Sequence, residues 1–277
     1  MSSPTLTSRK AARPRRSQNP FQPLLNTLKI FSPRAWREWL NAPASEEEMT
    51  ITEHLAELRA RLMVSLVAVL LCTIVAFVFS HKLMEIVLAP LLATGKKVVV
   101  LGVTEGFFTQ MKVALYAGII LAMPVIVYEV GAFIAPALQP NEKRWLLSLV
   151  PGATLLFILG VLFAYFVTLP AAINFLVNFI DPQFAETQPQ LEKYLTFATR
   201  MVLAIGVTFE IPMFVWFLAK LKIINAKQLS GFRRYAIVIA AIFAAIITPT
   251  GDPVNMALVG VPAYLLYELG VLLARLA

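Results

Sequence analysis

Long uncharged runs dominate the pattern of the chain. Three of them are Leu62–Phe79, Val113–Tyr128 and Trp145–Ile180, with 18, 16 and 36 residues. A fourth segment, Met201–Ala219, has nine uncharged residues on either side of Glu210. Because a membrane-spanning helix needs about 20 mostly apolar residues, these runs predict a protein that crosses the membrane several times.

Six helical spans are predicted, at about residues 61–80, 109–130, 146–169, 198–219, 233–248 and 254–273. The run from Trp145 is too long for one crossing, and Pro170 predicts a bend or break within it. A further short helix is predicted over Lys82–Ala93. The fifth apolar segment, Tyr235–Ile247, has only 13 residues. As a helix it covers about 20 Å of a hydrocarbon core about 30 Å thick, which predicts local thinning of the bilayer.

Residues 1–48 differ from the rest and are predicted to form a polar, basic N-terminal extension. Prolines interrupt its basic cluster, Arg9–Arg16, so we expect a disordered or interfacial segment that contacts anionic lipid. Residues 49–277 are predicted to form the membrane domain. The predicted fold class is therefore an all-α polytopic membrane protein with six transmembrane helices.

Composition and charge support this fold class and set the orientation. The chain is 58% hydrophobic and 14% charged, whereas a soluble domain carries about 25% charged residues. Of its 24 Lys and Arg residues, 18 lie on the side of the membrane that holds the N-terminus. The positive-inside rule therefore predicts that both termini are cytoplasmic, and it explains the net charge of +8 without a nucleic-acid partner.

Glu210 is the first candidate for chemistry, because a charge near the middle of a span costs roughly 2.5–3.5 kcal/mol on insertion scales. Such a group usually faces a cavity or a partner, and an ion- or proton-coupled secondary transporter would use it as its coupling carboxylate. Pro212 weakens the helix at the same level. No inverted repeat, which is common in such carriers, is apparent between the two halves.

Enzyme chemistry has little support in the sequence. The two histidines, His54 and His81, fall at opposite ends of the first span, and no phosphate-binding loop or Ser/His/Asp set is present. We therefore expect no catalytic residues, no metal and no cofactor.

Two further carboxylates lie at the cytoplasmic ends of predicted spans. Glu57 precedes the first span, and Glu142 lies in the turn between the second and third spans. One interpretation is structural, with Glu57 pairing with Arg61 at i,i+4 spacing and Glu142 favouring a helix N-terminus. The other is functional, because two carboxylates on one membrane face can bind a basic ligand through bidentate guanidinium contacts.

From about Thr50 onward, the chain resembles the TatC family, the polytopic receptor subunit of the twin-arginine protein translocase. The matching motifs occur in family order over 200 residues: His54-Leu-Ala-Glu-Leu-Arg59, Ala89-Pro-Leu91, Glu105-Gly-Phe-Phe108, Phe133-Ile-Ala-Pro-Ala-Leu138, Glu142-Lys-Arg144, Phe163-Ala-Tyr-Phe166, Phe209-Glu-Ile-Pro212 and Thr248-Pro-Thr-Gly-Asp-Pro253.

This resemblance implies a cupped, glove-like six-helix protein of a bacterial-type cytoplasmic membrane, which moves folded cargo and is not an enzyme. It implies that Glu57 and Glu142 contact the paired arginines of the signal peptide. Arg59 is expected to shape that pocket and Phe133 to support it.

The resemblance also implies partners and an energy source. Single-span subunits of the TatA/TatB type are expected near spans five and six, where Thr248 and Asn255 offer polar contacts. Glu210 would meet a partner's polar residue or the signal peptide inside the cup. Transport would use the proton motive force, and the protein is expected to form a homo-oligomer within the complex.

Four other positions match family motifs on or near the outer loops: Pro90, Glu105, Tyr165 and Asp252. For Pro90 and Tyr165, structural and functional roles both stay open, and Asp252 is expected to make a turn. Two alternatives to the translocase also remain at this point, namely the secondary transporter and a membrane scaffold without affinity for signal peptides.

Overall fold

The structure is a computed structural model that describes residues 51–139, 142–179, 187–248 and 252–277. The predictions for residues 1–48 lie outside the described residues. Apart from one isolated bridge between Val99 and Gln190, the regular elements of the described part are helical. In chain order they are α3 (Ile51–Val78), α4 (Ser80–Leu92), α5 (Glu105–Ile134), the 3₁₀ turn η2 (Ala135–Ala137), α6 (Lys143–Phe163), the π-helical turn η3 (Ala164–Thr168), α7 (Leu169–Asn178), α8 (Leu191–Thr208), α9 (Ile211–Lys220), α10 (Ala226–Ile247) and α11 (Pro253–Leu276).

Six segments of the described part are long and apolar enough to cross a membrane, which confirms the predicted number: Thr52–Val78, Glu105–Ile134, Lys143–Asn178, Leu191–Lys220, Ala226–Ile247 and Pro253–Leu276. The short helix expected after the first span is confirmed as α4. The helix that contains the short fifth apolar segment, α10, is longer than that segment suggested, with 22 residues. The reason is that α10 begins with a polar stretch that lies before its apolar part.

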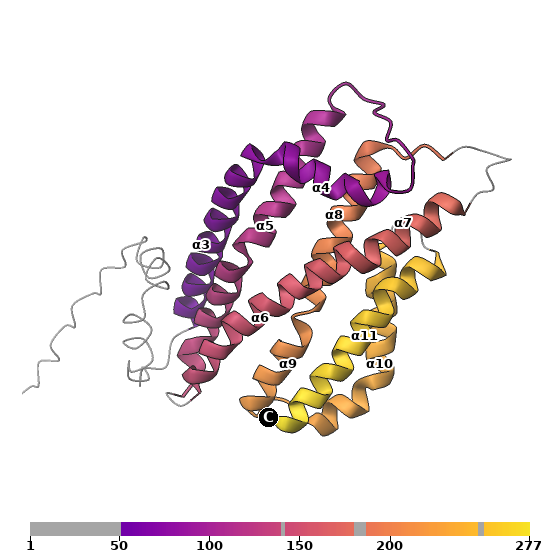
Figure 1. The fold of residues 1–277 in the computed structure, drawn as a ribbon. Coiled ribbons are helices and arrows are strands. Elements are labelled where there is room, and N and C mark those ends of the chain that lie inside the picture. The colour runs from indigo at the N-terminus through magenta and orange to yellow at the C-terminus, as the bar shows by residue number, and fades with distance from the viewer. Residues whose placement is uncertain (1–50, 140–141, 180–186, 249–251) are drawn as a thin grey trace, which may run out of the picture.

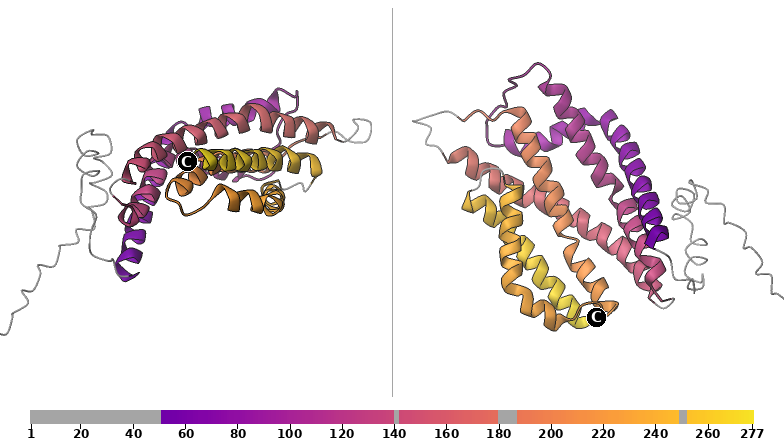
Figure 2. Two further views of the ribbon diagram at one scale, coloured as in Figure 1. Left: turned by 90° about the horizontal axis from the view of Figure 1, so that it is seen from below. Right: turned by 180° about the vertical axis from the view of Figure 1, so that it is seen from behind.

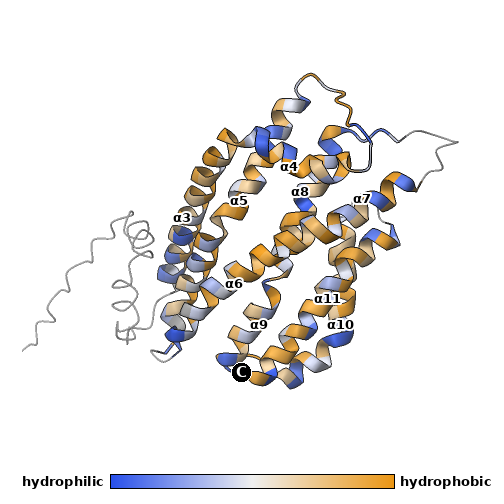
Figure 3. Ribbon diagram, in the orientation of Figure 1, coloured by the Kyte–Doolittle hydropathy of each residue, from blue (hydrophilic) through white to orange (hydrophobic). Residues whose placement is uncertain are grey.

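The helices run between two ends of the molecule (Figure 1). One end carries the starts of α3, α6 and α10 and the ends of α5, α9 and α11; we call it the Glu57 end. The opposite end carries α4 and the starts of α5 and α8; we call it the Glu105 end. Seen from below, α11 lies between α10 and the α6–α7 segment (Figure 2, left). Apolar residues cover the middle of the helices and polar residues gather toward the two ends, as expected for spans (Figure 3).

Near Pro170, where a bend or break is predicted, the helix continues, and its regular α-helical pattern changes in the turn before the proline. The helix passes through the π-helical turn η3 before it continues as α7, and Pro170 lies in the first turn of α7. Proline has no N–H to donate to the carbonyl four residues back, here that of Phe166, so the wider turn falls on the residues just before it.

The fourth span is two helices, not the single helix expected over residues 198–219. α8 ends at Thr208 and α9 begins at Ile211, with Glu210 at the N-cap position of α9. Pro212 again explains the break, because it cannot donate a hydrogen bond to the carbonyl of Thr208. Close packing supports the break: a Cβ atom on Gly160 of α6 would lie 2.8 Å from the Cβ of Phe209.

α3 packs mainly against α5, and the two helices approach closely at Gly118. A Cβ atom at this position would lie 2.2 Å from Oγ1 of Thr73 and 2.7 Å from its backbone N and Cα. The outer side of α3 is apolar and exposed, for example at Leu66 and Leu70. A helix that is apolar all round is typical of a membrane span, so this side is suited to lipid.

Substitution of Gly118 tests this contact. We expect Gly118→Ala to lower the midpoint of thermal unfolding in detergent, because the backbone of Thr73 must move and overpacking costs roughly 1–3 kcal/mol. Gly231→Ala is the matched control, since a Cβ there meets nothing within 4 Å. Equal unfolding midpoints for the two variants would contradict the close α3–α5 packing.

Candidate functional site

The Glu57 end holds a cluster of three charged side chains from α3 and α5. Arg61 donates from Nε and Nη2 to Oε1 of Glu57, at 3.2 and 3.0 Å, and from Nη1 to Oε2 of Glu129, at 3.0 Å. The Glu57 and Arg61 side chains are 19% and 21% exposed, whereas that of Glu129 is 1% exposed. The i,i+4 pair expected from the sequence is therefore present, and it is tied to a buried carboxylate on the neighbouring helix.

The predicted support from Phe133 has a structural counterpart. The ring of Phe133, at the end of α5, stacks on the ring of His54 in α3 with centroids 4.4 Å apart. Together with the Arg61 cluster, this stack joins the first turns of α3 to the last turns of α5. Arg59 is exposed to solvent beside them.

Glu142 lies at the N-cap position of α6 and is part-exposed. Its Oε2 accepts a hydrogen bond from the backbone N–H of Gln139 at 2.9 Å. The positive N-terminal end of the helix dipole also stabilises a carboxylate at this position.

The structure thus brings the starts of α3 and α6 to the same end of the molecule (Figure 1). Glu57 and Glu142 each engage one carboxylate oxygen in a local contact and remain partly exposed. An ionised carboxylate has two oxygens and about four acceptor positions, so each retains capacity for a guanidinium. The arrangement suits the recognition of a cationic ligand.

Sequence reasoning missed Arg61 as a bridge and missed Glu129 altogether. Glu129 directly follows the uncharged run Val113–Tyr128 and falls next to the last residue of the predicted second span, 109–130. The helix in fact continues to Ile134, which places Glu129 inside it. The signal was present, because a single carboxylate between apolar stretches is the same pattern that singled out Glu210.

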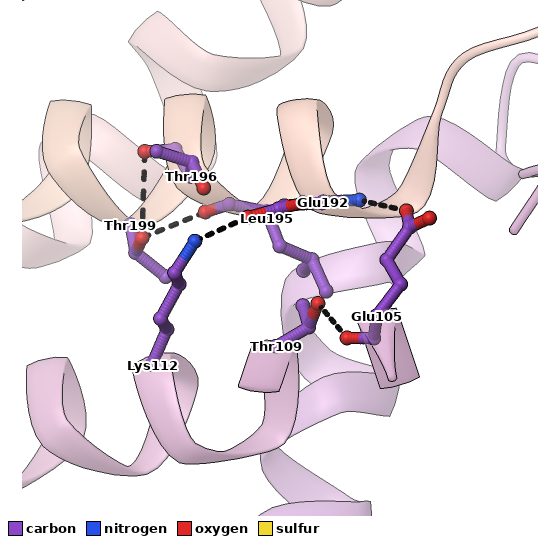
Figure 4. Close-up of polar contacts among 7 residues, drawn as sticks. All are labelled: Glu105, Thr109, Lys112, Glu192, Leu195, Thr196 and Thr199. Atoms are coloured by element: carbon purple, nitrogen blue, oxygen red, sulfur yellow. Dashed lines mark hydrogen bonds and ion pairs between the residues drawn. The ribbon is translucent and has the colours of Figure 1, made fainter. Parts of the chain in front are cut away.

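At the opposite end, Glu105 joins two segments that are far apart in the sequence (Figure 4). Its Oε2 accepts hydrogen bonds from the backbone N–H groups of Leu101 and Gly102, at 2.9 and 3.1 Å. Its Oε1 accepts from the N–H of Glu192, at the start of α8, at 2.9 Å. Lys112 of α5 forms an ion pair with the Glu192 side chain. These contacts give Glu105 a structural role, as a clamp between the α4–α5 loop and α8.

Tyr165 supplies the hydrogen bond that Pro90 cannot donate to a backbone carbonyl group of α4. Pro90 lies inside α4 and cannot donate to the carbonyl of Ile86, four residues before it. The hydroxyl of Tyr165 donates to that carbonyl at 2.8 Å. Tyr194 makes a similar bond to the next carbonyl, that of Val87, at 2.7 Å. The two tyrosines hold α4 against the spans, beside an apolar cavity of about 570 Å³ that Tyr165 also lines.

A double-mutant cycle tests the link between Pro90 and Tyr165. We expect Tyr165→Phe to destabilise the protein by about 0.5–1.5 kcal/mol, because the Ile86 carbonyl loses its donor. In a Pro90→Ala background the new N–H restores a donor, so the same substitution should cost less. Thermal unfolding of the four proteins measures the coupling, and equal losses in both backgrounds would contradict it.

The predicted intramembrane polar set is divided between two places. Glu210 is 4% exposed, and its Oε1 accepts no hydrogen bond from the described residues. Thr248 donates its hydroxyl to the carbonyl of Ala244 at 2.8 Å. Asn255 is fully buried and donates its backbone N–H and its Nδ2 to Asp252, at 2.7 and 2.8 Å. Asp252 is therefore the N-cap of α11, in keeping with the turn expected there.

The register of α9 and α11 separates Glu210 from Asn255. A Cβ on Gly270 would lie 3.2 Å from the Cβ of Val215, and Lys220 donates to the carbonyl of Ala277, so the two helices run parallel. Glu210 is five residues before Val215, whereas Asn255 is 15 before Gly270. At 1.5 Å per residue, the two side chains differ in depth by about 15 Å.

Comparison with known proteins identifies the family. The family model for "Sec-independent protein translocase protein (TatC)" matches residues 53–262. The chain belongs to the TatC family. It is 42% identical over 233 residues to the Sec-independent protein translocase protein TatC of Aquifex aeolicus, covering 83% of this chain and 96% of that protein. The chloroplastic TATC of Arabidopsis thaliana is 36% identical over 231 residues, covering 83% and 68%.

Solved structures agree with this assignment. The crystal structure of the twin-arginine translocase receptor TatC superimposes with a TM-score of 0.74 at 40% identity, covering 81% of this chain and 99% of that one. TatC proteins are translocase subunits and not enzymes, so the family also decides against the secondary transporter. The match to the family model includes every predicted site residue from Glu57 to Asn255, although it does not assign their individual roles.

Proposed function

We propose that this TatC-family protein binds twin-arginine signal peptides through Glu57 and Glu142, as the first step in moving folded proteins across the membrane. The observation that supports this most is the presence of two part-exposed carboxylates at the starts of α3 and α6, on one end of the molecule. Each is held by a local hydrogen bond and retains an oxygen for a guanidinium, whose planar N–H fork matches a carboxylate.

The Glu57 end is the cytoplasmic end in this proposal, with both termini inside. The excess of Lys and Arg near this end supports that orientation. The protein would then lie in a bacterial-type cytoplasmic membrane, in contact with lipid. Arg59 and the His54–Phe133 stack would shape and support the entrance to the docking site.

The apolar segment of the signal peptide would follow the spans away from this end. The cavity beside Tyr165 has a volume of about 570 Å³. Its lining is almost wholly apolar and includes residues of α3, α4, α5, α6 and α8. Burial of apolar side chains there would be favourable by roughly 25 cal/mol per Å². Single-span TatA/TatB-type partners, further copies of this chain and the proton motive force would complete the transport step.

Replacement of the two carboxylates tests the docking site. We expect Glu57→Gln and Glu142→Gln each to weaken binding of a twin-arginine peptide by roughly tenfold or more, because a hydrogen bond to a charged group contributes about 1.5–3 kcal/mol. Gln keeps an acceptor for the local contacts, so the fold should be preserved. Fluorescence titration of the detergent-solubilised protein measures the affinity.

Two controls accompany this titration. Glu85→Gln removes an exposed carboxylate on α4, at the opposite end, and should leave the affinity unchanged. A twin-lysine peptide should bind more weakly than the twin-arginine peptide, because Lys cannot form the bidentate contact. Undiminished binding by the Glu57→Gln/Glu142→Gln double variant would refute the docking site and would leave a scaffold without peptide affinity as the better description.

Glu210 has a separate role in this proposal, as a polar contact inside the membrane for a partner or for the moving peptide. The described residues leave its buried Oε1 without a hydrogen bond, which supports that role, because burying a polar atom costs free energy unless it is hydrogen-bonded. Its distance in depth from Asn255 suggests that Glu210 and the Thr248–Asn255 region contact different groups or act at different stages.

Substitution of Glu210 separates docking from transport. Glu210→Ala, with Glu210→Gln as the variant of matched volume, should bind the twin-arginine peptide within about twofold of the wild type. Both should block transport of a folded cargo into membrane vesicles, because the contact that Glu210 provides comes after docking. A loss of peptide affinity in the Gln variant would contradict this division.

A further inference from the structure

We infer that Glu129 determines how strongly Glu57 attracts a cargo arginine. It does so by pairing with Arg61, which neutralises part of the positive charge beside Glu57. This inference rests on the proposed docking at Glu57 and adds a residue that does not itself contact the peptide. Glu129 is thus a positioning residue, which acts through Arg61.

The geometry of Arg61 is the first support. Its guanidinium lies between two carboxylates, with two N–H groups on Oε1 of Glu57 and one on Oε2 of Glu129. Oε2 of Glu57 accepts no hydrogen bond from the described residues. An approaching guanidinium can therefore reach Glu57 without displacing Arg61 completely.

Burial is the second support. Glu129 is 1% exposed, and a carboxylate buried to that degree needs a cation or several donors close to it. Arg61 is one helical turn beyond Glu57 on α3, and its Nη1 donates to Oε2 of Glu129. The hydrogen bond to Glu129 keeps the Arg61 guanidinium against α5, while the carboxylate of Glu57 is partly exposed.

The balance of charge is the third support. Glu57 and Arg61 alone form a neutral pair, which has little attraction for a second guanidinium. With Glu129 the cluster carries a formal charge of −1, and docking of one cargo arginine makes it neutral. Since partly buried charges are poorly screened, the third carboxylate should raise the affinity of Glu57 for the peptide by about fivefold.

Titration of full-length protein variants with a synthetic twin-arginine peptide tests the inference. Glu129→Gln should weaken binding about fivefold, and the difference should change little as the ionic strength rises, because the cluster is partly buried. The double variant Arg61→Gln/Glu129→Gln leaves Glu57 with its own charge and no competing cation, so its affinity should return to within about twofold of the wild type. Glu268→Gln, which disrupts an ion pair with Arg233 between α10 and α11, is the matched control and should have no effect.

The possible results separate this inference from the proposed function. If Glu57→Gln does not weaken binding, the docking site itself is wrong. If Glu57→Gln weakens binding but Glu129→Gln does not, Glu129 has no part in it. If the double variant is as weak as Glu129→Gln alone, Glu129 acts through the packing of α3 on α5 and not through the charge of Arg61, which would also overturn the inference.

Discussion

Backbone hydrogen bonding inside hydrocarbon is the constraint on which this structure depends, because no water is present to satisfy a free N–H or C=O group. Prolines remove one such N–H each, and three of those in the described helices show different ways of meeting the constraint. At Pro90 the hydroxyl of Tyr165 donates to the carbonyl left free. Before Pro170 the helix widens into a π-helical turn. Before Pro212 the span divides into two helices, with Glu210 at the junction. These departures from a regular α-helix are thus consequences of backbone pairing.

Buried carboxylates must also be hydrogen-bonded or paired, and leaving one unpaired costs more free energy than leaving a backbone group unpaired. Glu105 is satisfied by three backbone N–H groups and becomes a clamp between α8 and the α4–α5 loop. Glu129 is paired with Arg61, which links it to the exposed surface through Glu57. Glu210 has an oxygen that the described residues leave unpaired. A satisfied carboxylate stabilises the fold, whereas an incompletely satisfied one is suited to a ligand or a partner.

Much of the architecture could be predicted from the sequence. The spans follow from the length of the apolar runs, and the helix between the first two spans was also anticipated. The ends were less accurate, because polar residues continue a helix beyond its apolar part, as they do at the start of α10. Glu129 was not singled out because it lies next to the end of the predicted second span, 109–130, where a charge is common, whereas α5 continues to Ile134 and buries it.

By itself, the sequence determined the number of spans, the family and all the carboxylates of interest except Glu129, because hydropathy and motif order are properties of the chain alone. Only the tertiary structure decided which residues meet. It placed Arg61 between Glu57 and Glu129 and set Tyr165 against the carbonyl freed by Pro90. It also separated Glu210 from Asn255 in depth. Such pairings depend on how helices distant in the chain cross and on their register, and the periodicity of one helix carries no information about its neighbour.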